Sequence, residues 1–415
     1  MKAQIARGAD FENGNLIHTT YADGSEVVYS YDKNGCLIQQ TDENGHTVIY
    51  TYDEAGNILT SIDSLGNVSS YEYDMAGNCT AAIDPLGNRM EWTYDAAGNK
   101  TSEQVADGTV KKWIYDASGN IASETDGEGN TTVYEYDSFG NLTHTAYPDG
   151  SEESCTYDGF GHMLSKADAF GNASLYKYDG AGNLIEETDS LGRKTKYTYN
   201  ADGQKIEMLL PSGAKEIYQY NVANGLMSGT TDSDGKTYFF SYDANGNLTE
   251  QFDEYGVVQR NVYDTRDRII KTTDALGNST EYTYDGKGNL LSVMDPQGNM
   301  TGYAYDAADR LIRETDALGN ATVYEYDATG NCVKRTDPLG GVTTWEYDAA
   351  GRKNSERDAL GNMIQWEYDA EGREISETDA LGNQTRTEYD SMGRIIRQIG
   401  KRGGVTTYSY DAVGN

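Results

Sequence analysis

The stretch NATVYEYDATGNCVKRTDPLGG, residues 320–341, decides the fold of this chain. It contains two turn motifs, YDATGN and TDPLGG, and each follows a short run rich in alternating side-chain types. The Tyr-Asp dipeptide at Tyr326 returns every 21 residues from Tyr31 to Tyr410, as Tyr-Asn at positions 199 and 220, with one residue inserted between positions 220 and 232. A repeat of this regularity predicts one continuous array of small units that contact their neighbours, and not a set of globular domains.

Glycine recurs at two phases in each repeat, and an aspartate usually stands three residues before it. In D-x-x-G-N the aspartate can accept hydrogen bonds from its own turn, and glycine supplies the left-handed conformation that closes a hairpin with a G1 bulge. Asp267 and Asp309 replace this glycine, and aspartate tolerates positive φ. The inserted residue is expected in the turn around Asn224-Gly225, because an insertion within a strand would move side chains to the other face.

About six residues separate the turns, which is the length of a short strand. The repeat tyrosine and the residue two positions before it share one face of that strand. The earlier position is usually aromatic, and on the return strand an aliphatic residue often follows the turn asparagine. The spacing predicts ladders of aromatic side chains along the sheet. The ladder positions include all four tryptophans: Trp92, Trp113, Trp345 and Trp366.

These features predict an all-β protein, a repetitive antiparallel β-meander of 21-residue YD repeats. Strand twist should curl this sheet into a spiralling, shell-like band of roughly one winding. A parallel β-helix is the alternative, but two large aromatic side chains per rung would overfill its interior. We expect residues 1–9 to be an N-terminal lead-in and residues 10–415 to be one array that stops in mid-repeat.

Composition excludes several partners. The formal net charge is −34, and an acidic surface repels nucleic-acid phosphates. No run of 18 apolar residues is present, so no transmembrane segment is predicted. The first ten residues, MKAQIARGAD, lack the apolar centre of a signal peptide, although such a signal could precede this fragment.

The sequence contains no pattern that predicts catalysis, a cofactor or a metal. Its four histidines occupy different repeat phases, and neither a nucleophile elbow nor a phosphate loop occurs. The segment 232–235, DSDG, comes nearest to a calcium loop but lacks the other ligands. The four cysteines are expected to be unpaired, because their repeat phases do not suggest a disulfide framework. They are Cys36, Cys79, Cys155 and Cys332.

The motifs Y-x-Y-D-x-x-G-N at residues 324–331 and T-D-x-L-G-N at 315–320 resemble the YD repeat of RHS proteins. Related arrays occur in Tc toxin shell components and in teneurins. The resemblance implies a long antiparallel sheet coiled into a hollow shell that often encloses a C-terminal toxin. The family's self-cleaving D-P-x-G-L junction has no match here, because Asn88, Asn299 and Gly341 stand where its leucine would follow. No catalytic residue is therefore carried over.

We interpret the chain as a wall segment of an RHS-type shell, without enzymatic activity, in a larger secreted or cell-surface bacterial protein. Its implied partners are an enclosed toxin or effector domain and flanking shell repeats that lie outside this fragment. The alternative is an extracellular glycan-binding or adhesive surface on which exposed aromatic rings stack against sugars. The candidate stacking residues are Trp92, Trp113, Trp345 and Trp366.

Overall fold

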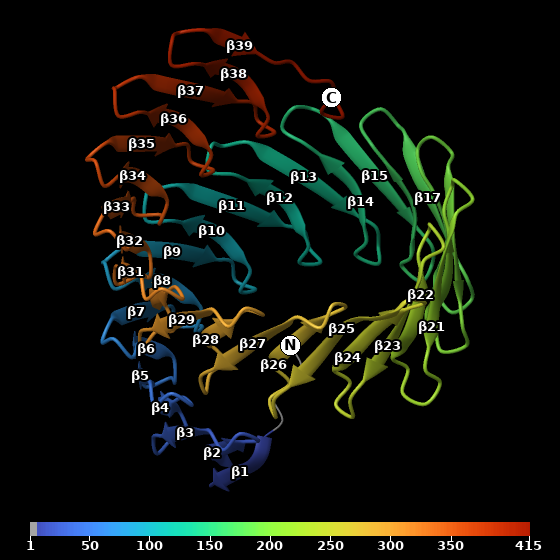
Figure 1. Cartoon of the computed structure of the whole chain (residues 1–415). Helices are drawn as coiled ribbons and strands as arrows, with labels where there is room; N and C mark the ends of the chain where they lie inside the picture. Colours follow the sequence, from blue (N-terminus) through green and yellow to red (C-terminus); the bar gives the residue numbers. More distant parts are fainter. Residues whose placement is uncertain (1–5) are drawn as a thin grey trace.

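The computed structural model describes residues 6–415, which form 39 strands in a single sheet (Figure 1). Each strand pairs antiparallel with the strands that precede and follow it in the chain. The antiparallel meander predicted from the repeats is confirmed, and the parallel β-helix is wrong. Of the expected lead-in, residues 1–5 lie outside the described residues and residues 6–9 belong to the first strand. Residues 6–415 contain no helix long and apolar enough to cross a membrane.

The strands alternate between two kinds. The first kind comprises all odd-numbered strands, of which β3 to β37 end at the repeat tyrosine. They are β1 (Ala6–Glu12), β3 (Glu26–Tyr31), β5 (Thr47–Tyr52), β7 (Val68–Tyr73), β9 (Arg89–Tyr94), β11 (Val110–Tyr115), β13 (Thr131–Tyr136), β15 (Glu152–Tyr157), β17 (Ala173–Tyr178), β19 (Lys194–Tyr199), β21 (Lys215–Tyr220), β23 (Thr237–Tyr242), β25 (Gly256–Tyr263), β27 (Ser279–Tyr284), β29 (Met300–Tyr305), β31 (Ala321–Tyr326), β33 (Val342–Tyr347), β35 (Met363–Tyr368), β37 (Gln384–Tyr389) and β39 (Val405–Thr407).

Even-numbered strands begin just after the turn that follows the tyrosine. They are β2 (Asn15–Tyr21), β4 (Leu37–Thr41), β6 (Ile58–Ile62), β8 (Cys79–Ile83), β10 (Lys100–Gln104), β12 (Ile121–Thr125), β14 (Leu142–Ala146), β16 (Met163–Ala167), β18 (Leu184–Thr188), β20 (Lys205–Leu209), β22 (Met227–Thr231), β24 (Leu248–Asp253), β26 (Ile269–Asp274), β28 (Leu290–Met294), β30 (Leu311–Thr315), β32 (Cys332–Thr336), β34 (Lys353–Arg357), β36 (Glu374–Thr378) and β38 (Ile395–Ile399). We call the turns after odd-numbered strands YD turns and those after even-numbered strands LG turns.

The YD turn after β31 shows how one aspartate closes a hairpin. The Asp327 backbone N–H donates to the Asn331 carbonyl at 2.9 Å, and Gly330 donates back to the Asp327 carbonyl at 3.2 Å. One carboxylate oxygen of Asp327 accepts the backbone N–H groups of Thr329 and Asn331, and the other accepts the Asn331 amide. Gly330 has a φ of 97°, as a G1 bulge requires. At this position Asp267 and Asp309 have φ values of 61° and 59°, which confirms the prediction for both.

The extra residue of the irregular repeat lies in the turn between β21 and β22. There the Gly225 N–H reaches back four residues to the Asn221 carbonyl, whereas the glycine of an ordinary YD turn reaches back three. Because the insertion stays outside the strands, the registers of β19 to β23 keep Tyr199 and Tyr242 on the same face. The predicted site of the insertion is confirmed.

The repeat tyrosine has a specific partner. In most repeats its hydroxyl donates to the carbonyl of the residue 15 positions earlier, which lies at the start of the preceding even-numbered strand; Tyr284, for example, donates to Ile269 at 2.9 Å. That residue lies in the β-bulge that follows each YD turn, where ladder pairing is interrupted. The same bond is made by Tyr31, Tyr52, Tyr94, Tyr115, Tyr136, Tyr157, Tyr199, Tyr220, Tyr263, Tyr305, Tyr326, Tyr347, Tyr368, Tyr389 and Tyr410. This bond explains why the position is tyrosine and not phenylalanine.

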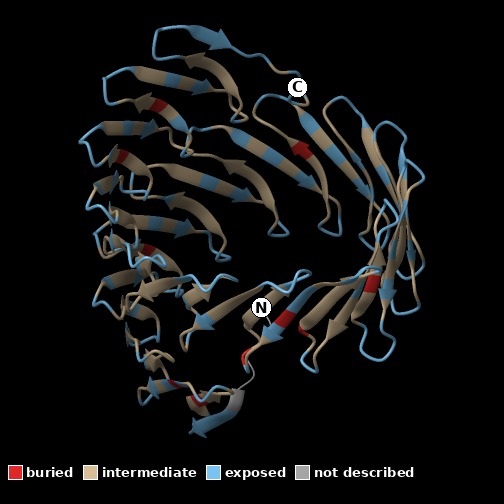
Figure 2. Ribbon diagram, in the orientation of Figure 1, coloured by how far each residue is buried: buried red, intermediate tan, exposed pale blue. Residues whose placement is uncertain are grey.

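The sheet is one layer thick, and Figure 2 shows most of it half-buried or exposed. Val27 and Ala81 are the only fully buried apolar residues among those described. Equivalent positions of the predicted aromatic ladders lie two strands apart, at about 9.6 Å, which is too far for their rings to touch. Lys205 lies between two such rings, with its ammonium 5.6 Å from the Tyr197 ring centre and 4.8 Å from that of Tyr218.

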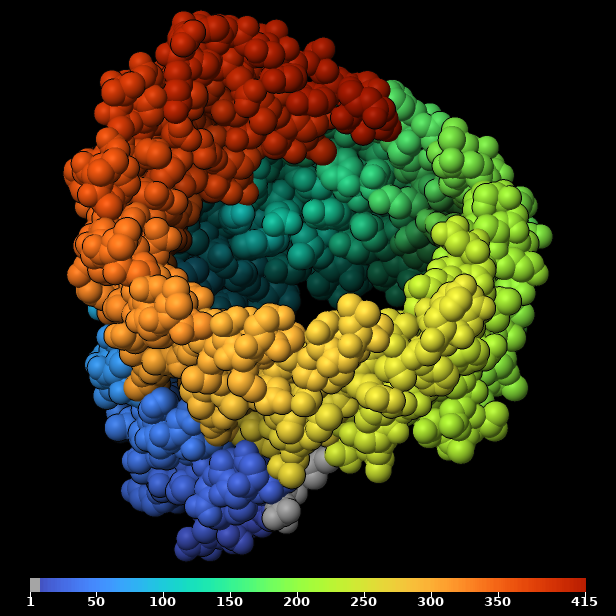
Figure 3. All heavy atoms as spheres, viewed as in Figure 1, coloured from blue at the N-terminus to red at the C-terminus, as the bar shows by residue number. Residues whose placement is uncertain are grey.

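The expectation of roughly one winding is wrong. The turn between β14 and β15 contacts the turn between β37 and β38, so one winding takes 23 strands (37 − 14), and 39 strands make about 1.7 windings (39/23). Sheet twist alone underestimates the curl, because a bulge recurs in almost every YD hairpin and bends the sheet repeatedly. Figure 3 shows the second winding, in yellow to red, in front of the first around an open centre.

We predict that replacing Tyr284 by phenylalanine destabilises the array by about 0.5–1.5 kcal/mol, since the Ile269 carbonyl loses its hydroxyl donor. Urea unfolding followed by circular dichroism measures the loss. Tyr73→Phe is the matched control, because the Tyr73 hydroxyl makes no corresponding bond within residues 6–415. Equal effects of the two substitutions would contradict a specific role for the hydroxyl.

Candidate functional site

The site that distinguishes this molecule from a flat meander is a seam between the two windings. We define the seam as the LG turns at residues 21–150 together with the YD turns at residues 264–394, which meet edge to edge. Paired residues across it are usually 241 to 245 positions apart in sequence. In Figure 1 the orange and red strands β33 to β37 accordingly lie beside the blue and teal strands β9 to β13.

Three arginines of the second winding each bind an acid of the first. The distances are 2.9 Å for Arg352–Asp107, 2.5 Å for Arg373–Glu128 and 2.9 Å for Arg394–Asp149. Each arginine is the fifth residue of a YD turn, and each acid is the third residue of an LG turn. All six side chains are 17–28% exposed, so these pairs are better shielded from water than ordinary surface ion pairs.

The local structure holds each seam arginine in place before it meets its partner. The Arg352 Nε donates to the Asp348 carboxylate of its own turn at 2.7 Å, the bond that asparagine makes in other repeats. Its Nη1 donates to the Asp369 carbonyl at 3.0 Å, and its guanidinium lies 5.3 Å from the Tyr368 ring centre. Only Nη2 is directed across the seam to Asp107. Contacts within its own winding therefore already fix most of this long side chain, so that little further conformational entropy is lost when it binds across the seam.

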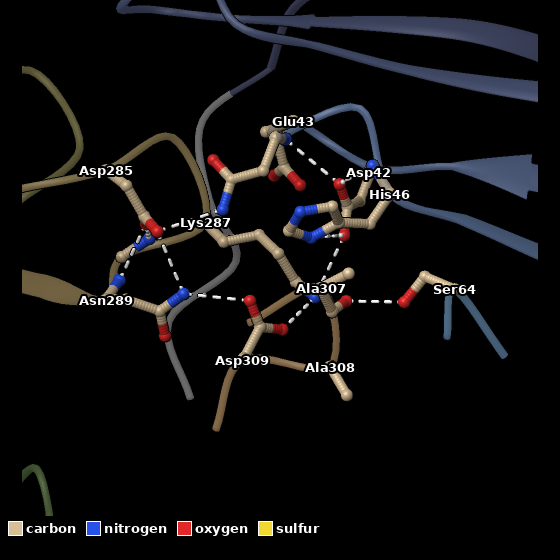
Figure 4. A network of polar contacts seen from close by, with 12 residues as sticks. Asp42, Glu43, His46, Ser64, Asp285, Lys287, Asn289, Ala307, Ala308 and Asp309 are labelled. Atoms are coloured by element: carbon tan, nitrogen blue, oxygen red, sulfur yellow. Dashed lines mark hydrogen bonds and ion pairs between the residues drawn. The ribbon is translucent and has the colours of Figure 1, made fainter. Parts of the chain in front are cut away.

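Another part of the seam uses lysine and amide groups, as Figure 4 shows. Lys287 forms ion pairs with Asp42 across the seam, at 2.9 Å, and with Asp309 of the neighbouring turn. The Asn44 amide donates to Asp285 at 2.9 Å, and the Ser64 hydroxyl donates to the Ala307 carbonyl at 2.5 Å. One network thus joins LG turns of the first winding to consecutive repeats of the second.

Arg266 is the most buried charge of the seam, with a side chain only 2% exposed. Its guanidinium lies 4.4 Å from the ring centre of Tyr21. The Nη2 group donates to Glu43 at 3.0 Å, and Nε lies 3.3 Å from Asp23. A buried arginine requires such partners, so these first-winding acids and the tyrosine together form a socket for it.

The electrostatics favour an ionised seam. Burial alone would raise the pKa of the Asp107 carboxyl, but hydrogen bonds from Thr109 and the charge of Arg352 outweigh it and hold that pKa below its ordinary value. Burial likewise opposes ionisation of Asp149, while Ser151 and Arg394 lower its pKa overall. These shifts stabilise the charged form that the arginines bind.

The tryptophans singled out from the sequence lie half-buried in the sheet, away from a single common site. The indole N–H groups of Trp92 and Trp345 donate to the opposite Glu103 and Glu356, at 3.1 and 2.8 Å. Trp113 and Trp366 each have a lysine ammonium 4.5 Å from the ring centre, which occupies one face. Trp345 also lines a groove of about 750 Å³ between the windings. Glycan stacking by these rings stays a prediction.

The described residues offer no cluster of three or more potential metal ligands. The four cysteines are free thiols in the structure. His18, His46, His144 and His162 each lie near one or two carboxylates of the sheet, as scattered pairs. The geometry of residues 6–415 therefore supports docking of the second winding on the first.

Sequence reasoning missed the seam, although one signal could have indicated it. At the fifth position of the YD turn, asparagine is common in the first part of the chain, whereas arginine occurs only at residue 268 and beyond. Within the seam, the third position of the LG turns carries acids at residues 23, 107, 128 and 149, and outside it only at residue 234. Each change is unremarkable within one repeat. Their complementarity is visible only when repeats from opposite sides of the seam are compared.

A family model described as RHS Repeat matches most of the chain. The matched segments are 12–47, 31–68, 52–89, 73–110, 115–152, 157–190, 178–215, 263–300, 284–322, 305–342, 326–363 and 368–404. The chain belongs to the RHS repeat family. No protein with a curated description matches it.

Solved structures of Tc toxins share this RHS fold. The crystal structure of TcdB2-TccC3-Cdc42 matches 97% of the chain at a TM-score of 0.72 with 15% identity. TcdB2-TccC3-TEV matches 97% at 0.61 with 14% identity, and a holotoxin pore from Photorhabdus luminescens matches 96% at 0.57 with 14% identity. The RHS chain spans about a quarter of these chains, at 26%, 27% and 28%. At these identities the likeness concerns the fold, a shell-like β-sheet.

We predict that changing Arg352, Arg373 and Arg394 together to asparagine opens the seam while leaving the turns intact. Asparagine is the usual residue at this position and keeps the bond to the turn aspartate, whereas the ion pairs across the seam, worth about 0.2–1 kcal/mol each, are lost. Small-angle X-ray scattering should show a larger radius of gyration. Arg193→Asn is the control, since Arg193 binds Asp189 of its own turn outside the seam. An unchanged radius in the triple variant would refute a clamping role.

We also predict that the spiral stays closed from pH 8 to about 5 and opens as the pH falls below about 4. The folded pKa of Asp107 and Asp149 is depressed, so their contribution is present above the unfolded value and is lost as the pH drops through the folded one. Scattering across a pH series measures the transition. Opening already between pH 6 and 7 would contradict a role for these carboxylates in closing the spiral.

Proposed function

We propose that this chain is a wall segment of an RHS-type shell that encloses a toxin or effector domain within a larger secreted or cell-surface protein. The observation that carries the proposal is the seam. A single-layer sheet becomes the wall of a container only when successive windings are joined, and here ion pairs and hydrogen bonds join them for most of their overlap.

The dimensions fit a wall around a polypeptide. A winding of 23 strands at about 4.8 Å per strand has a perimeter near 110 Å and a backbone radius of roughly 18 Å. Inward side chains leave a clear radius of roughly 13 Å, which is narrower than a folded domain of about 100 residues but wide enough for an extended or partly folded chain. Encapsulation by this segment would therefore favour a cargo without a compact fold.

The proposed role is structural and not enzymatic. The charged groups of the seam pair with one another, and their geometry accounts for their placement without a substrate. One structure that shares the fold is described as a Tc holotoxin pore, which supports a place in a toxin assembly. A shell of this kind would act outside the producing cell, so we infer a secreted or surface location.

Photo-crosslinking in the complete protein that carries these repeats tests the proposal. A crosslinking residue is placed at position 133 on one face of β13 and, in a second variant, at the neighbouring position 134 on the other face. Only the face that lines the lumen should capture a polypeptide from outside the repeats, and that polypeptide should resist protease. Capture from neither face, or a cargo cut as fast as the same polypeptide expressed alone, would count against encapsulation.

A further inference from the structure

We propose that the groove between the two windings beside Trp345 is a binding site for a small organic cation with an apolar body. Its volume of about 750 Å³ lies within the usual range of small-molecule sites. The turns at residues 84–88 and 105–109 of the first winding meet the turns at residues 327–331 and 348–352 of the second here. Both sides of the site therefore belong to the seam, and the site does not depend on an enclosed cargo.

The groove lies where a basic side chain of the seam is missing. At most turns of the seam the second winding supplies such a side chain to an acid of the first. Lys287, the third residue of its YD turn, binds Asp42, the first residue of an LG turn, at 2.9 Å. Two repeats further along, the same two positions are Thr329 and Asp84. Threonine carries no charge, so Asp84 lacks the cation that its counterpart binds.

Two carboxylates of the groove have no basic partner among residues 6–415. Asp84 accepts hydrogen bonds only from groups of its own LG turn, and Asp327 only from groups of its own YD turn. Burial alone would raise the pKa of the Asp327 carboxyl, but hydrogen bonds from Asn331 and Thr329 outweigh it and hold that pKa below its ordinary value. No lysine, arginine or histidine lines the groove. The groove thus presents negative charge that no protein cation offsets.

The rest of the lining suits an apolar body beside that charge. Tyr71, Trp345 and Tyr347 contribute aromatic side chains, and the Trp345 indole N–H donates to Glu356 at 2.8 Å, which holds this ring in place. Aromatic rings attract cations within about 6 Å of the ring centre. Aliphatic lining residues include Ile83, Met90 and Val333. An inorganic ion would leave this apolar surface in water, whereas an organic cation would cover it.

A small residue of the first winding leaves the space open. Ala82 stands opposite Tyr71 in the sheet and lines the groove. The same position of another repeat holds Met208, opposite Tyr197. The fold therefore accepts a long side chain at this position, and the presence of alanine is not required by the strand itself.

Equilibrium dialysis of the whole chain against three naphthalene derivatives of similar size tests the proposal. They carry a trimethylammoniomethyl, a hydroxymethyl or a sulfonatomethyl group, and so are positive, neutral and negative. In about 150 mM salt, which screens the long-range attraction of the acidic chain, we expect saturable binding of a single cation per chain. Its affinity should exceed that of the neutral alcohol about tenfold, and the sulfonate should not bind. Absence of saturable cation binding, or equal binding of the cation and the alcohol, would overturn the proposal.

Two substitutions should each abolish binding of the naphthyl cation while leaving the fold intact. Ala82→Met fills the groove with the side chain that Met208 places at this position elsewhere. Thr329→Lys brings an ammonium group to Asp84, in the arrangement that Lys287 has with its own acid. Circular dichroism checks that both variants are folded.

Matched controls separate the groove from a general attraction of cations to an acidic chain. Thr230→Met introduces methionine at the equivalent strand position opposite Tyr218, away from the groove. Ser118→Lys adds lysine at the third position of a YD turn outside the seam, so that its net charge equals that of the Thr329→Lys variant. Both controls should bind the cation as the unaltered chain does. Binding retained in both groove variants, or lost to the same extent in the controls, would refute a specific site.

Discussion

The aspartate that opens each turn is the constraint on which the rest of the structure depends. Its carboxylate accepts two backbone N–H groups of its own turn, and in most repeats it also binds the side chain at the fifth position. These bonds hold glycine, or occasionally aspartate, in the left-handed conformation and so set the length of every hairpin. A fixed hairpin length keeps the register, and a fixed register makes every repeat bend in the same direction.

The single-layer architecture gives side-chain hydroxyls and charges an unusual share of the stabilisation. With almost no fully buried apolar residue among those described, the sheet relies on ladder hydrogen bonds, on the tyrosine hydroxyls at the bulges and on cross-strand pairs. Each contribution is small, but each recurs in successive repeats, so stability grows with the number of repeats. The high content of tyrosine relative to phenylalanine follows from this arrangement.

The seam joins the two windings of the repetitive sheet and so fixes the overall shape of the spiral. Substituting arginine for asparagine at the fifth turn position keeps the local bond and adds a group that reaches beyond the winding. The same bond to the turn aspartate is thus made both in turns that face solvent and in turns that contact the other winding. Beside Leu86 the facing turn carries the neutral Asn331 at this position. The residues at the third position of the LG turn and the fifth position of the YD turn therefore differ between otherwise equivalent repeats according to what each turn contacts.

The sequence by itself determined the strands, both kinds of turn, the antiparallel order and the place of the inserted residue near Gly225, because all of these depend on contacts within one or two repeats. It also indicated the RHS family through the same local motifs. Only the tertiary structure decided the number of strands per winding and the partners of Arg352, Arg373 and Arg394. Winding is the sum of many small bends, and a small error per strand accumulates until a different repeat lies opposite. The tryptophans can be recognised in the sequence as large rings, whereas the role of the seam arginines depends on the geometry of the complete spiral.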